Sequence, residues 1–168
     1  KNYGYFAQQT SDGGYVATGY ATSYGDGDYD SFVVKLDPSG NVSWMKIIGG
    51  GADDFLFSIH QTSDGGYIAG GSTESYGPGG QDFFFSKFDS SGNISWTKAL
   101  GGGGNEHGTF INPISGGGYI MTGYTSSYGA GDNNVFNVKL DSSGNISWAK
   151  TVGGTDADPG NYIQQTSD

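Results

Sequence analysis

Short apolar runs alternate with polar, glycine-rich turns along the whole chain. In the run Phe32–Leu36 alternate residues are apolar, and Val33 on the opposite face is apolar as well. Strands that are apolar on both faces lie between two layers of structure. No stretch keeps apolar residues at the 3.6-residue period of an amphipathic helix. The pattern therefore predicts an all-β protein made of short strands.

The pattern returns every 52 residues. Its most constant segment is Asp37–Trp44, which recurs as Asp89–Trp96 and Asp141–Trp148. A repeat of this length is a unit of structure. We place the chain in a single repeat domain, 1–168, with units 9–60, 61–112 and 113–164 and with 1–8 and 165–168 belonging to flanking units.

Four strands are expected for each repeat. Examples are 55–62 for the first, 15–20 for the second, 32–36 for the third and 42–48 for the fourth. The Asp-x-Ser-Gly-Asn sequence between the third and fourth strands predicts a tight hairpin, because Asp accepts turn amides and Gly tolerates positive φ. Four antiparallel strands repeated head to tail predict β-propeller-type blades, and three blades are fewer than the roughly four to eight that close a ring. We therefore expect them to be part of a larger ring or filamentous assembly.

The tryptophan that ends each hairpin motif is the largest apolar side chain of the repeat. We expect it to be a core residue that joins each unit to its neighbour. The strand alternation places it on the same face as the residue at the start of the strand, which is Val42, Ile94 or Ile146.

These motifs resemble the QTSDGGY…KLDSSGNxxW repeats of large secreted or surface proteins of bacteria and archaea, which are predicted to form propellers. The hairpin also resembles the Asp-box of sialidase-like propellers and the tryptophan-docking motif of quinoprotein propellers. The resemblance implies a propeller-type fold and an extracellular or cell-surface location. It transfers no catalytic residue, and the third unit departs from it because Pro113-Ile-Ser-Gly replaces Gln-Thr-Ser-Asp.

The composition narrows the function further. Acidic residues number 17 against 7 lysines, with no arginine, which excludes a nucleic-acid-binding class that depends on basic side chains. There is no cysteine for a disulfide or a thiolate metal site. No apolar run approaches the length of a membrane helix, and no signal peptide is visible. Because the chain starts with Lys1, we expect a mature or trimmed product.

One loop of the first repeat contains candidate metal ligands. Asp26, Asp28 and Asp30 have the D-x-D-x-D spacing of a calcium loop, but the sixth position, a glycine in such loops, is Ser31. A solvated loop is the favoured interpretation and calcium the alternative; no other cofactor is expected. Neither His60 nor His107 has a partner at ligand spacing.

Other polar positions recur with the repeat. The set Asp30, Asp82 and Asn134 is expected to cap the third strands, and the set Asn2, Asp54, Glu106 and Asp158 to form hydrogen bonds at blade junctions rather than an acid–base site. For Lys46, Lys98 and Lys150 we expect salt bridges to Asp, with anion binding as the alternative.

Two sets of residues are candidates for sugar chemistry. Tyr24, Tyr76 and Tyr128 could stack on sugars or serve in packing. Asn41, Asn93 and Asn145 each begin an Asn-x-Ser sequon at a hairpin turn, which makes them glycosylation candidates, although Asn also suits the turn itself.

We expect a non-enzymatic extracellular or cell-surface module with a structural or adhesive role; the alternative is a lectin-like propeller with one site per blade. The expected partners are copies of itself or further repeats of a parent chain, with glycans as the alternative, but not nucleic acid or a membrane. Residues 157–168 stand in register with 1–12. We therefore expect this last segment to be a first strand that pairs with material outside the chain.

Overall fold

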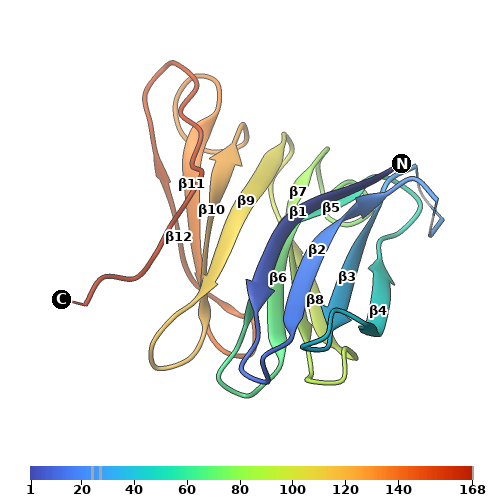
Figure 1. The fold of residues 1–168 in the computed structure, drawn as a ribbon. Helices are drawn as coiled ribbons and strands as arrows, with labels where there is room; N and C mark the ends of the chain where they lie inside the picture. Colours follow the sequence, from blue (N-terminus) through green and yellow to red (C-terminus); the bar gives the residue numbers. More distant parts are fainter. Residues whose placement is uncertain (24, 27, 168) are drawn as a thin grey trace.

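The computed structural model describes residues 1–23, 25, 26 and 28–167, and in these residues it contains twelve strands and no helix. They form three four-stranded antiparallel sheets (Figure 1). The first sheet consists of β1 (Asn2–Gln9), β2 (Tyr15–Ala21), β3 (Asp30–Leu36) and β4 (Val42–Ile48). The second consists of β5 (Asp54–Gln61), β6 (Tyr67–Thr73), β7 (Asp82–Phe88) and β8 (Ile94–Leu100). The third consists of β9 (Glu106–Pro113), β10 (Tyr119–Thr125), β11 (Asn134–Leu140) and β12 (Ile146–Val152).

The predicted all-β architecture with four-stranded blades is confirmed. In each blade the strands lie in chain order, so the first and fourth strands form its edges. The blades begin at a different point from the sequence units. Residues 1–8, which we placed in a flanking unit, form most of β1 and pair with β2 in the first blade.

A β-bulge in each hairpin changes the expected alternation of side chains. In the first blade Lys35 pairs with Trp44, but Leu36 pairs with Val42, so the fourth strand has one extra residue here. Such a bulge moves the next side chain to the other face. The residues expected beside the tryptophans are therefore exposed instead, namely Val42, Ile94 and Ile146.

The hydrophobic core lies between the blades. One cluster joins the first and second blades, and a second cluster joins the second and third. In β7 the consecutive residues Phe83, Phe84 and Phe85 are all buried, with Phe84 in the first cluster and the other two in the second. The middle blade is therefore covered on both faces, whereas each outer blade is covered on one face. The two-sided burial that we predicted from Phe32–Leu36 does not hold in the first blade, where Val33 is buried in the core but Phe32, Val34 and Leu36 are only half-buried.

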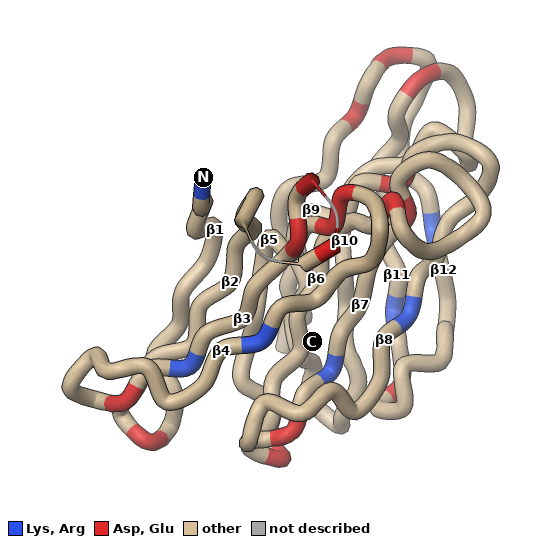
Figure 2. The backbone as a smooth tube through the Cα atoms, turned by 90° about the vertical axis from the view of Figure 1, so that its right-hand side faces the viewer, with Lys and Arg blue, Asp and Glu red and all other residues tan. Residues whose placement is uncertain are grey.

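Charges are segregated along the blades. Figure 2 shows acidic residues gathered in the loops at both ends of the strands and lysines along the strands between them. Among the described residues no helix has the length and apolar character needed to cross a lipid bilayer.

Candidate functional site

The hairpin motif forms the same turn in all three blades. In the second blade Asp89 Oδ1 accepts hydrogen bonds from the backbone N–H groups of Ser91 (2.9 Å) and Asn93 (2.8 Å). The Asn93 Nδ2 group donates to Asp89 Oδ2 at 2.9 Å, and this bond is the main reason why the pKa of Asp89 is lowered. Gly92 completes the turn with a φ of 79°. The motif is thus a self-contained turn whose aspartate already has its partners.

The tryptophan of each inner junction packs on the hairpin turn of the following blade. The Trp44 ring centroid lies 5.7 Å from that of Tyr67, and a Cβ placed on Gly92 would lie 2.7 Å from the Trp44 ring. Trp96 has the same relation to Tyr119 and to Gly144. In the second and third blades the glycine therefore serves both the turn and the neighbouring indole.

A lysine accompanies the tryptophan across the junction. Lys98 Nζ donates to Asn145 Oδ1 of the next blade at 3.1 Å and lies 5.8 Å from the ring centroid of Trp96. Lys46 likewise contributes to the lowered pKa of Asp89. Lys46 and Lys98 thus lie near the next turn, and in the described residues neither forms the expected salt bridge.

The salt bridges come from another lysine position of the repeat. Lys35 Nζ lies 2.8 Å from Asp12 Oδ2, and Lys87 Nζ lies 2.9 Å from Asp64 Oδ2. Hydrogen bonds from Thr62 and Lys87 lower the pKa of Asp64 to about 2. In the third repeat Gly116 replaces this aspartate.

Buried carboxylates hold the loops between blades. Asp54 Oδ2 accepts from the backbone N–H of Gly50 at 2.7 Å and from Ser75 Oγ at 2.6 Å. Glu106 Oε2 accepts from Gly102 N–H, also at 2.6 Å. The expected hydrogen bonding at blade junctions is thus present, and the carboxylates that make it are inaccessible to solvent.

A second carboxyl group lies close to each of these two buried carboxylates. A Cβ on Gly101 would lie 1.7 Å from Asp82 Oδ1 and 2.2 Å from Glu106 Oε2, so both groups converge on this glycine. Asp82 Oδ1 has no hydrogen-bond partner among the described residues, and burial, followed by the charge of Glu106, raises the pKa of Asp82. In the third repeat Asn134 and Asp158 converge on Gly153 in the same way, with one charge fewer.

We expect Asp82→Asn to stabilise the protein at pH 7 by about 1 kcal/mol, because it removes a buried, poorly paired charge. The raised pKa means that Asp82 favours folding when protonated, and that this contribution is lost as the pH rises through its folded-state pKa. The gain from Asn should therefore shrink towards pH 3. Asn is compatible with the site, since Asn134 Nδ2 donates to the carbonyls of Ala130 and Asp132.

Urea unfolding at pH 3, 5 and 7 measures this effect. Asp64→Asn is the control and should have the opposite effect, a loss of stability at pH 7. Because the pKa of Asp64 is lowered, its carboxylate stabilises the fold above pH 3.8, and this contribution is lost as the pH falls towards about 2. A loss of stability in Asp82→Asn that is as large at pH 7 as at pH 3 would contradict the assignment.

The calcium candidates do not converge. Asp26 and Asp28 are exposed on their loop, whereas Asp30 is buried at the start of β3, where it approaches Gly49. Within the described residues no group of three or more metal-ligating side chains lies close enough to hold an ion. Calcium binding stays a prediction.

The candidate tyrosines connect neighbouring blades. Tyr76 Oη donates to the carbonyl of Gly49, and Tyr128 Oη to that of Gly101, both at 3.0 Å. The Tyr76 ring also stacks on Phe84. Both tyrosines keep an exposed part, and Tyr24 lies outside the described residues. Their contacts are those of packing residues, and sugar stacking stays a prediction.

The sequons lie at exposed turns. Asn41, Asn93 and Asn145 are exposed, and each donates its Nδ2 to the aspartate of its own turn. Asn145 also accepts from Lys98. Glycosylation stays a prediction.

Comparison with known proteins adds no assignment. No protein-family model and no curated protein matches this chain.

An aromatic stripe that we did not predict crosses the three blades. Tyr5 contacts both Tyr20 and Phe57, with ring centroids at 5.4 and 5.0 Å. Phe57 in turn contacts His107 at 4.9 Å, and His107 stacks on Tyr124 at 5.0 Å. The sequence feature that could have predicted this stripe is a pair of alternating aromatic residues in each of two first strands. These are Tyr3 and Tyr5 in β1 and Phe55 and Phe57 in β5.

The two histidines are packing residues. His60 is buried between Phe6 and Phe110, and burial lowers its pKa to about 4. His107 Nδ1 lies 3.3 Å from Ser72 Oγ and 3.1 Å from Gln81 Oε1. These polar contacts fix its ring within the aromatic stripe.

Proposed function

We propose that the chain is a non-enzymatic extracellular or cell-surface module with a structural or adhesive role that builds larger assemblies. The observation that carries this proposal is the use of its repeated residues. The hairpin aspartates and glycines make contacts within turns, and the junction carboxylates and the tryptophans Trp44 and Trp96 make contacts at the junctions between blades. A repeat whose recurring residues form the contacts between blades suits a structural protein that presents or extends a surface.

The positions of the junction and hairpin carboxylates support a non-enzymatic role. General acid–base catalysis requires a carboxyl group within reach of a substrate. Asp54, Asp82 and Glu106 are fully buried beneath the junction loops. Asp37, Asp89 and Asp141 are accessible, but they are occupied by the amides of their own turns.

A second candidate is carbohydrate binding, which the aromatic stripe favours. Tyr3 and Tyr5 are exposed at its end on β1, and Tyr5 lies against both Tyr20 and Phe57. Exposed aromatic faces held by their neighbours suit stacking on sugar rings. This site would lie on the first strands rather than at the tyrosines of the loops.

Two measurements test the proposal. Fractionation of source cells with a specific antibody should place the protein at the cell surface or in the medium; recovery in the cytoplasm would overturn that location. A glycan array, run beside a panel of glycoside, ester and peptide substrates, should show neither sugar retention nor turnover. Retention that is lost in Tyr5→Ala but kept in Tyr76→Phe would establish the second candidate, and turnover would overturn both.

A further inference from the structure

The two outer blades present complementary halves of the inner junction. Trp148 on the third blade is 38% exposed, and no hairpin turn of the described residues packs on it as turns pack on Trp44 and Trp96. On the first blade Tyr15 is 40% exposed, whereas its repeat equivalents Tyr67 and Tyr119 are 2% and 4% exposed. The turn glycine Gly40 has nothing within 4 Å of a Cβ placed on it, unlike the turn glycines of the other blades.

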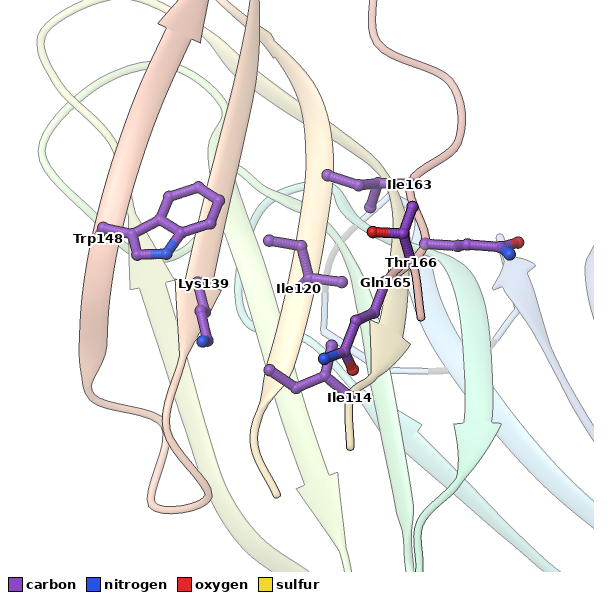
Figure 3. A pocket seen from close by; sticks show the side chains of 8 residues that line it. Ile114, Ile120, Lys139, Trp148, Ile163, Gln165 and Thr166 are labelled. Carbon is purple, nitrogen blue, oxygen red and sulfur yellow. The ribbon is translucent and has the colours of Figure 1, made fainter. Parts of the chain in front are cut away.

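A hollow marks the uncovered half on the third blade (Figure 3). It has a volume of about 270 Å³, and Trp148, Lys139, Ile120 and Ile163 are among the residues that line it. At the first inner junction the indole of the equivalent Trp44 packs against a tyrosine from the second strand of the next blade. A tyrosine ring is therefore the side chain that fits beside Trp148.

We propose that this face binds the first blade of a second copy of the chain, head to tail, in a contact that repeats the two inner junctions. The inference rests on the proposed structural function and names its partner. Trp148 would pack on Tyr15 and Gly40 of the second copy, and Lys150 would face its Asn41, as Lys98 faces Asn145. Contacts of this type close into a ring or grow into a fibre.

The C-terminal segment already occupies the place of the next first strand. The Asp158 N–H donates to the carbonyl of Asn133 at 2.6 Å, as Glu106 N–H does to Gln81. Asp158 Oδ2 accepts from the N–H of Gly154 at 2.9 Å, which repeats the junction contact of the buried acids.

The far end of the segment is held in the same repeated way. Gln165 Oε1 accepts from the Ser115 N–H at 2.7 Å, and Gln61 Oε1 accepts from the Ser11 N–H at 2.8 Å. These hydrogen bonds therefore repeat contacts that β5 and its equivalents make with the preceding blade. The segment 157–167 is, however, not the strand that we expected: it is mostly exposed, and in the described residues no second strand pairs with it.

When a second copy docks, its β1 would have to occupy the same place as the C-terminal segment of the first copy. One of these two segments must therefore be displaced. In β5 the residues Asp54 and Ile59 are both fully buried. The C-terminal segment has the same residue types, Asp158 and Ile163, at the equivalent positions. At these positions β1 has Asn2 and the smaller Ala7 instead. The segment fills the junction better, so it would pair with β2 of the second copy and displace that copy's β1 by strand exchange.

Sedimentation velocity over a wide concentration range tests the contact. The parent chain should associate, and Trp148→Ala or Gly40→Asn should each weaken association about 30-fold or more. Asn is chosen because it tolerates positive φ. Ser39→Ala in the same turn is the control and should associate like the parent. An equimolar mixture of the two blocked variants should form a dimer and stop there, because each keeps one working end.

Strand exchange is tested by cross-linking, since the chain has no cysteine of its own. Ala17 pairs with Ala7 in the first blade, so after exchange it would lie opposite Ile163 of another copy. The double variant Ala17→Cys/Ile163→Cys should give interchain disulfides when it is oxidised after association. Reduced Ala7→Cys/Ala17→Cys should form its intrachain disulfide less when it is oxidised at associating concentrations than when it is oxidised at high dilution. Association without these changes would overturn the exchange. A monomer at all concentrations would overturn the whole inference, while the location and glycan tests still judge the proposed function separately.

Discussion

Trp96→Ala is expected to lower the free energy of unfolding by about 3 kcal/mol, because truncating a large aromatic side chain at a packed contact removes apolar burial and leaves a cavity. Trp96 packs against the core cluster between the second and third blades, and its ring contacts Tyr119 and Gly144. The loss would expose the junction and leave Lys98 without the indole beside it. Denaturant unfolding followed by circular dichroism measures the effect.

Trp148→Ala is the matched control, because Trp148 stands at the same repeat position without a following blade. At protein concentrations too low for self-association, its loss should cost less than about 1 kcal/mol. Equal destabilisation by the two variants would show that the tryptophans act within their own blade and not at the junctions.

Gly92→Ala is expected to destabilise the protein by about 2–5 kcal/mol. Its φ of 79° costs a residue with a Cβ about 1–2 kcal/mol. The new methyl group would also lie 2.7 Å from the Trp44 ring, and overpacking of this kind costs about 1–3 kcal/mol more. The measurement is the denaturation midpoint at constant slope.

Two other glycines separate these contributions. Gly40 and Gly65 have φ values of 84° and 80°, and a Cβ on either would meet nothing within 4 Å. Their alanine variants should show the φ cost alone. If Gly92→Ala loses no more stability than these two, the indole contact contributes nothing and the interpretation of the junction is wrong.

The junction also relates stability to assembly. The two core clusters each join adjacent blades, so the middle blade has two junctions and each outer blade has one, and the first and third blades also meet at an edge contact between Phe6 and Phe110. In such arrays stability is close to a sum of unit and interface contributions. A second copy that supplied another junction would therefore stabilise the chain while extending it.

Much of the local structure follows from the sequence alone. The predicted fourth strand coincides with β4, and the predicted second and third strands differ from β2 and β3 only at their ends. The hairpin turn was also predictable, because an Asx side chain and a glycine with positive φ satisfy it within five residues. These features depend on alternation and on hydrogen bonds between near neighbours, which a sequence displays directly.

The tertiary structure decided which distant residues meet. The bulge that exposes Val42 depends on the pairing of β3 with β4, and one extra residue reverses the facing of the side chains that follow. The convergence of Asp82 and Glu106 on Gly101, and the stripe from Tyr5 to Tyr124, require the placement of whole blades against each other. Periodicity defines the face of a strand, but the packing of sheets determines the partner that this face receives.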